Sequence, residues 1–132
     1  MTDNPIKPAA TRRGPENYFT GTVWMEDIIA APPEMGVAVV RVTFEPSART
    51  AWHTHPVGQI LVVESGVGRA QRLGEPIREI HAGDSVYFAP GVKHWHGAAP
   101  DRVMVHLAIQ RADDAGQYAE WLEQVTDAEY AS

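Results

Sequence analysis

Short runs of apolar and β-branched residues follow one another between Gly36 and Gln110, and each run is closed by turn residues such as Gly and Pro. Within two of these runs, every second residue can line the same face, because side chains alternate along a strand. Many short strands separated by turns are typical of a sandwich or barrel. We therefore expect an all-β chain with strands at residues 22–25, 37–44, 50–55, 59–64, 68–72, 77–80, 85–88, 94–97 and 104–110.

The two ends of the chain have a different pattern. Residues 1–20 are rich in Pro, Arg, Asn and Gly and predict an extended arm. After residue 112, the apolar positions Tyr118, Trp121, Leu122 and Val125 fall at helical spacing, and Asp113 or Asp114 can cap the first turn. We thus predict an arm at 1–20, a barrel at 21–112, and at 113–132 a short helix, ending near residue 125, and a tail packed on the barrel.

Composition and charge narrow the possible functions. The chain has 132 residues, which suits one domain, and 44% of them are hydrophobic, enough for a core. A formal net charge of −6 without any basic run argues against nucleic-acid binding. With no cysteine, a bound metal would have to use histidine, carboxylate or amide ligands.

The sequence predicts neither a membrane protein nor an exported one. The N-terminus has no apolar stretch behind a basic flank, and the longest apolar runs are far too short to cross a bilayer. We therefore expect a cytoplasmic protein that does not enter the membrane.

The histidines carry the candidate chemistry. His53 and His55 stand two apart and can point to one side of a strand. Gln59 follows across a Pro-Gly turn, and His94 follows a later turn that can bring it to the same place. Three imidazole nitrogens and one amide oxygen can fill four of the six octahedral positions around one divalent metal ion, with two positions open for water or substrate. Trp52 and Trp95 should point to the opposite face as packing or interface residues.

The spacing of these residues resembles the two signature motifs of the cupin superfamily. The motifs are His53-x-His55-x3-Gln59-x6-Gly66 and Gly83-Asp84-x6-Gly91-x2-His94, and the resemblance covers about residues 36–110. It implies a single cupin barrel of the jelly-roll type, with motifs at 47–66 and 83–98. The chain departs from the pattern at four positions, with Ser47 for Gly, Gln59 for Glu, Pro90 one place late and Ala98 for Asn. A neutral Gln59 leaves the full charge on the metal, which favours Lewis-acid chemistry over oxidation.

Longer stretches of the sequence are similar to the small bacterial manganese-dependent cupin hydroxynitrile lyases over about residues 17–130. The stretches are 19–23, 43–46, 48–56, 90–100, 106–110 and 125–127. This resemblance implies cleavage of cyanohydrins to an aldehyde or ketone and cyanide, with the reverse addition. It implies metal ligation by His53, His55, Gln59 and His94, acid–base roles for His106 and His96, and a pocket lined by Val40, Val42 and Gln110. Histidine suits proton transfer because its pKa lies near working pH, and we expect His106 to be the base ahead of His96.

Several alternatives remain open at this point. A metal-dependent cupin dioxygenase of small aromatic substrates would use the same histidines, and a non-catalytic cupin would bind a metal or small ligand without turnover. Manganese comes from the resemblance, while iron, cobalt, nickel, copper or zinc also fit a three-histidine site. The expected partners are a small-molecule substrate and further copies of the chain, as a dimer or tetramer, because small cupins commonly pair their barrels.

Overall fold

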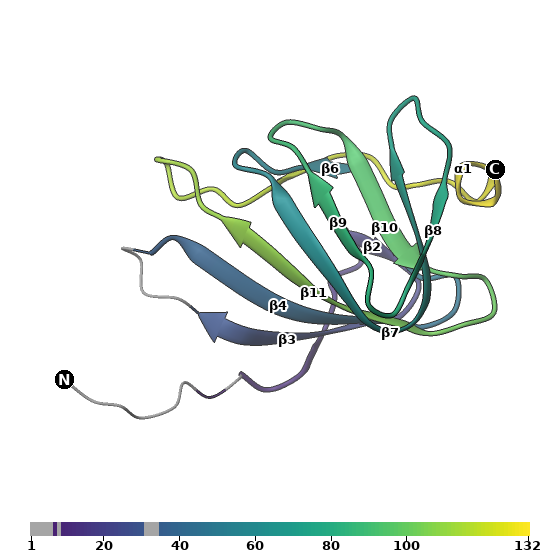
Figure 1. Cartoon of the computed structure of the whole chain (residues 1–132), viewed down its shortest axis with the longest axis horizontal. Coiled ribbons are helices and arrows are strands. Elements are labelled where there is room, and N and C mark those ends of the chain that lie inside the picture. The colour runs from purple at the N-terminus through teal and green to yellow at the C-terminus, as the bar shows by residue number, and fades with distance from the viewer. Residues whose placement is uncertain (1–6, 8, 31–34) are drawn as a thin grey trace.

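A curled antiparallel sheet, a half-barrel, makes up most of the molecule (Figure 1). The computed structural model describes residue 7 and residues 9–30 and 35–132. The all-β class and the short C-terminal helix are confirmed. In the described residues the strands are β1 Arg12–Arg13, β2 Phe19–Thr20, β3 Val23–Ala30, β4 Val37–Phe44, β5 Arg49–Thr50, β6 His53–Thr54, β7 Gln59–Arg72, β8 Arg78–His81, β9 Ser85–Phe88, β10 His94–Ala98, β11 Met104–Arg111 and β12 Glu120–Trp121, and the helix is α1 Asp127–Ala131.

Strand β7 joins the two halves of the sheet, which runs in the order β1-β3-β4-β11-β7-β10-β5-β2. Its first half pairs with β9 and β11, and its second half pairs with β8 and β10. The sequence predicted two strands here, interrupted at Gly66, but the strand continues through that residue. Gly66 has a φ of 80°, and a Cβ there would clash with the carbonyl oxygen of Val103, so the bend requires glycine.

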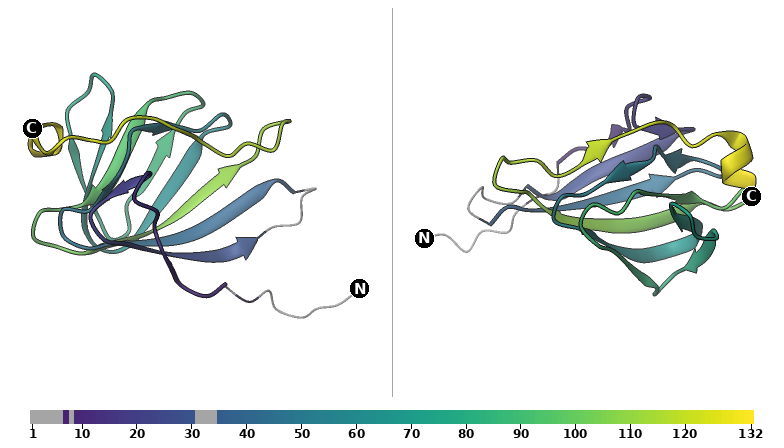
Figure 2. Two further views of the ribbon diagram at one scale, coloured as in Figure 1. Left: turned by 180° about the vertical axis from the view of Figure 1, so that it is seen from behind. Right: turned by 90° about the horizontal axis from the view of Figure 1, so that it is seen from above.

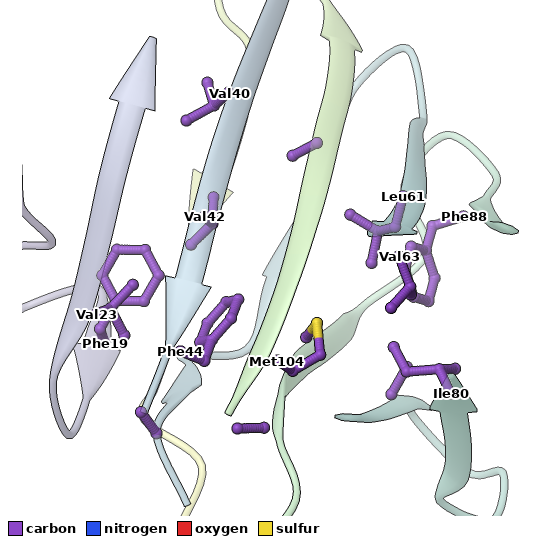
Figure 3. Packing of buried hydrophobic residues seen from close by; sticks show 14 residues of the cluster. Phe19, Val23, Val40, Val42, Phe44, Leu61, Val63, Ile80, Phe88 and Met104 are labelled. Atoms are coloured by element: carbon purple, nitrogen blue, oxygen red, sulfur yellow. The ribbon is translucent and has the colours of Figure 1, made fainter. Parts of the chain in front are cut away.

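The concave side of the half-barrel holds the core. Alternation along β4 turns Val40, Val42 and Phe44 inward, where they meet residues such as Leu61 and Met104 (Figure 3). Each such side chain stabilises the fold by roughly 1.5–3 kcal/mol when fully buried. In the β11–β4 register, His106, Ala108 and Gln110 lie opposite Val42, Val40 and Ala38. The apolar side chains of β4 and the polar side chains of β11 therefore line the same interior.

The predicted helix over residues 113 to about 125 is wrong in position. Residues 113–119 are irregular with a turn at 114–116, Glu120 and Trp121 form β12 against β6, and the helix is α1, at Asp127–Ala131. Thr126 caps α1 in a capping box with Glu129. Figure 2 shows the whole segment running back along the half-barrel from the end of β11 to the helix.

Tertiary contacts explain why the helical spacing of the apolar residues led to a wrong position for the helix. The peptide groups of residues 122 and 123 pair with Trp52: Leu122 donates to its carbonyl at 2.8 Å, and Glu123 accepts from its amide at 2.8 Å. Val125 packs with Trp52 and Trp95 in a second core cluster. The expected packing role of the two tryptophans is confirmed, and an extended segment buries the apolar residues that a helix would have buried.

A buried arginine fastens this segment to the sheet. The Arg49 guanidinium donates to the carbonyl of Val125 at 2.8 and 3.2 Å and to Asp127 at 2.7 Å, and it lies 4.7 Å from the ring centre of Tyr130. Because a buried charge is costly unless it is paired, these contacts tie the C-terminal segment to β5.

The N-terminal arm packs on the barrel where it is described. Arg12 and Arg13 form β1 against β3, and the Arg12 side chain contacts Asp27 at 2.6 Å. Residues 1–6 and 8 of the predicted arm lie outside the described residues, and the predicted domain boundaries stay predictions. In the described part of the chain, no helix is long and apolar enough to cross a membrane.

Candidate metal centre and pocket

Histidines gather inside the half-barrel. Of the six in the chain, all but His81 are buried, and they come from β6, the turn after it, β10 and β11. His53 and His94 lie directly opposite each other in the β10–β6 pairing. Such a concentration of imidazoles in an interior has to be explained by hydrogen bonds, a metal ion or catalysis.

Three of these rings are held in the same way. Each donates its Nδ1–H to a backbone carbonyl oxygen at 2.8 Å: His53 to Ala51, His55 to Tyr118 and His94 to Val92. A carbonyl oxygen can only accept, so Nδ1 carries the proton and Nε2 is left with a lone pair. This arrangement is the usual support of a metal-ligating histidine.

The amide of Gln59 adds a fourth acceptor. Its nitrogen donates to Oε1 of Gln110 at 3.1 Å, and its oxygen lies 3.1 Å from Nε2 of His94. Two acceptors at that distance repel each other unless a proton or a cation lies near both. Burial lowers the pKa of His94 to about 3, which removes the proton at ordinary pH. Nε2 of His55 is also buried with no hydrogen-bond partner in the described residues. The donor set fits a divalent cation.

Electrostatics keep all five buried rings neutral. Burial is the main cause of a lowered pKa at each of them, and repulsion from neighbouring histidines adds to it at His53, His94 and His96. The pKa of His106 falls to about 4. Because neutral imidazole is the form that binds metals and accepts protons, the site is prepared for both tasks.

A buried three-histidine metal site follows from these positions. Within the described residues, the ligand atoms of His53, His94 and His96 lie within 4.8 Å of one another. The ring of His55 is centred 4.9 Å from that of His53 and 5.4 Å from that of His94. All four sequence-predicted ligands therefore lie close together, and His96, which we expected to act in proton transfer, adjoins the same centre.

The remaining two histidines hold each other. Nε2 of His106 and Nδ1 of His96 are 2.9 Å apart, so one donates to the other. Their outer nitrogens, Nδ1 of His106 and Nε2 of His96, are buried without partners among the described residues. The ring of Phe44 packs against both, with centroids 5.2 and 5.9 Å away. The two imidazoles thus form one hydrogen-bonded unit with a free nitrogen at each end.

A cavity of about 370 Å³, counting the part open to solvent, lies beside these groups. Its lining includes the predicted pocket residues Val40, Val42 and Gln110 together with His53, His96 and His106. Its mostly apolar walls suit the organic part of a small ligand.

Sequence reasoning missed one wall of this cavity. Trp121 lines it, and its ring stacks on His53 at 4.6 Å and on Tyr18 at 4.6 Å. Nothing in the local sequence indicated this, because the helical spacing around Trp121 predicts a helix packed on the outside of the barrel. Phe19 and Thr50 also line the cavity, and they lie opposite each other in the β2–β5 pairing.

Comparison with known proteins agrees with this geometry. Residues 40–109 match the model of the cupin domain, and the chain belongs to the cupin family. It is a homologue of the (R)-mandelonitrile lyase of Granulicella tundricola, with 55% identity over 121 residues and 92% of each chain covered.

Solved structures support the fold. A cupin-like protein from Thermotoga maritima superposes with a TM-score of 0.84 at 44% identity, covering 89% of each chain. The DMSP lyase DddQ from Ruegeria pomeroyi shares the fold at a TM-score of 0.57 and 23% identity, with 65% of this chain and 43% of that chain covered.

Proposed function

We propose that this protein is a metal-dependent hydroxynitrile lyase, which cleaves cyanohydrins such as mandelonitrile to an aldehyde or ketone and hydrogen cyanide and catalyses the reverse addition. The observation that carries the proposal is the 55% identity to an (R)-mandelonitrile lyase across nearly the whole of both chains. The buried histidines beside an apolar cavity supply groups that such a reaction needs.

The proposed metal ligands are Nε2 of His53, His55 and His94 and Oε1 of Gln59. The support is their common arrangement: each histidine is anchored through Nδ1 to a backbone carbonyl, whereas His96 uses Nδ1 to bond His106. The nitrogen and oxygen donors suit manganese, and iron, cobalt, nickel or zinc are compatible with them. When bound, a divalent ion supplies positive charge that favours the deprotonated form of a substrate hydroxyl.

Proton transfer is assigned to the His96–His106 pair. Whichever tautomer is present, one outer nitrogen of the pair carries a lone pair and the other carries a proton. With Nδ1 of His106 as the base, it takes the hydroxyl proton, and the shared proton shifts from His106 to His96. As the bond between the carbinol carbon and the nitrile carbon breaks, Nε2 of His96 gives its proton to the departing cyanide. The products are the carbonyl compound and hydrogen cyanide, and the pair is left neutral in its other tautomer.

The apolar wall receives the organic part of the substrate. Val40, Val42 and Phe44 line the cavity from β4, next to the polar groups on β10 and β11. A phenyl or alkyl substituent would lie against this wall while the hydroxyl faces the histidines.

Benzaldehyde release from mandelonitrile tests the proposed function. Manganese-reconstituted protein and metal-stripped protein would be compared in mildly acidic buffer, which suppresses spontaneous decay. Release that depends on the metal supports the lyase. No release above the stripped control, together with oxygen uptake on an aromatic substrate, would favour the cupin dioxygenase instead.

We also propose that the protein is a homo-oligomer, a dimer or tetramer. The support is an apolar group on the outer face, where the exposed Ile60 pairs with the exposed Tyr87 on β9 and with the half-buried Ile109 on β11. Exposed apolar patches commonly mark contact surfaces. Light scattering measures the mass in solution, and a monomer at micromolar concentration would contradict the proposal.

A further inference from the structure

The amide of Gln59 has two ends that differ chemically. Its oxygen carries lone pairs and can bind a cation, whereas its NH2 group can only donate hydrogen bonds. A carboxylate at this position would present an oxygen in either orientation. A glutamine must instead be turned the right way, so this site needs a partner that sets the orientation.

Gln110 is placed to be that partner. Gln59 on β7 and Gln110 on β11 lie directly opposite each other in the antiparallel pairing, where side chains on one face are in contact. Oε1 of Gln110 accepts from Nε2 of Gln59 at 3.1 Å, and in this orientation of the amide Oε1 of Gln59 lies 3.1 Å from Nε2 of His94. Both glutamines line the cavity, and Gln59 is buried.

The opposite orientation would block the metal centre. If the Gln59 amide turned over, its NH2 group would face the lone pair on Nε2 of His94, the nitrogen left free by the bond from Nδ1 to Val92. That contact would be a good hydrogen bond. It would occupy Nε2 of His94 and turn the oxygen of Gln59 away, so neither atom could bind the metal. The orientation of a single amide therefore separates a metal-binding arrangement from a closed one.

We propose that Gln110 is a positioning residue of the metal centre, which holds the Gln59 amide with its oxygen toward the metal. This role is additional to its place in the pocket lining. The inference rests on the proposed ligand role of Gln59, and it does not depend on which reaction the protein catalyses.

Manganese affinity, measured by titration calorimetry on the full-length protein, tests this role without reference to turnover. Gln110→Met keeps the length of the side chain and removes the acceptor, and we expect the dissociation constant to rise about tenfold, as for other groups that orient a metal ligand. Gln110→Glu keeps an acceptor for the Gln59 NH2 group, and we expect affinity equal to or tighter than that of the wild type. The thermal midpoint of each metal-free variant checks that the fold is intact.

A double-mutant cycle separates positioning from a general structural effect. In a Gln59→Glu background the ligand needs no orienting, so adding Gln110→Met should change the dissociation constant less than twofold. An equal loss of manganese affinity in both backgrounds, or no loss in Gln110→Met alone, would overturn the proposal. If the Gln59→Glu background fails to bind manganese, the test is the affinity of Gln110→Glu, and weak binding by that variant would overturn the proposal. Unchanged affinity in Gln59→Ala would instead remove the ligand role of Gln59.

Discussion

The five buried histidines fall into two groups that share a residue type and differ in what holds them. His53, His55 and His94 are each anchored by a backbone carbonyl, which cannot titrate or donate. His96 and His106 are anchored by each other. A ring fixed to the backbone has one settled tautomer and one lone pair at a fixed place, as a metal ligand requires.

A pair of neutral rings that share a hydrogen bond has two tautomers, which differ in the ring that donates. It can accept a proton at one end and release one at the other without acquiring net charge, which a buried site disfavours. The difference between the groups thus lies in the partner of one ring nitrogen and not in burial or pKa, which are similar in both.

The largest effect is expected from removing a backbone-anchored ring. His94→Ala or His53→Ala takes away one proposed ligand and leaves the others without a complete shell, so the metal should be lost and turnover should fall to background. Metal analysis after dialysis measures the occupancy. A variant that keeps a full equivalent of metal would show that the ring is not a ligand.

Removing the far ring of the pair should separate chemistry from metal binding. In His106→Ala the metal stays bound, while the rate should fall about 10²- to 10⁴-fold, the usual contribution of acid–base catalysis. The comparison needs kcat and metal content on the same preparation. An unchanged rate at full occupancy would place the base elsewhere.

Both groups should destabilise the metal-free protein in acid. A histidine whose pKa is lowered by folding stays neutral in the native state and takes a proton in the unfolded state, so stability is lost as pH falls below about 6.5. Each ring contributes about 1.4 kcal/mol per pH unit until its native pKa is reached, which is about 4 for His106 and about 3 for His94.

Urea unfolding of the metal-free protein at pH 7, 6 and 5 measures this slope. His106→Phe should reduce it by the share of one histidine. If the free energy of unfolding is the same at pH 7 and pH 5, the rings are not held neutral by the fold.

A smaller effect is expected from the apolar wall of the cavity, because its residues anchor none of the buried histidines. Val42→Ala removes two methyl groups from the cavity lining, and KM for mandelonitrile should rise about tenfold with metal content unchanged. Val39→Ala on the same strand is the matched control, because alternation turns residue 39 to the other face. Equal changes in the two variants would show that the wall does not contact substrate.

Periodic and motif signals predicted the centre of the molecule well. Alternation located the strands around Val42 and His106, and motif spacing brought His53, His55, Gln59 and His94 together. One motif departure acquires a physical meaning in the structure, since Ser47 has a φ of 65°, a conformation that glycine adopts without strain. The motif's preference for glycine at this position therefore follows from the positive φ that the backbone adopts.

The C-terminal segment shows what the sequence could not predict. Tyr118 acts through its carbonyl oxygen, a group that every residue has, so no side-chain pattern identifies it as the anchor of His55. Trp121 looked like a helical packing residue because its spacing suits a helix, yet pairing with β6 turns it onto His53. Both roles depend on contacts between segments more than 60 residues apart.

The division between ligands and proton carriers is tested most directly at His55 and His96. The ligand atoms of His53, His94 and His96 lie within 4.8 Å of one another, whereas the anchoring pattern selects His53, His55 and His94. The measurement is manganese stoichiometry in His55→Ala and His96→Ala, reconstituted and dialysed side by side. We predict that His55→Ala loses the metal and that His96→Ala retains it, and the reverse result would contradict this division.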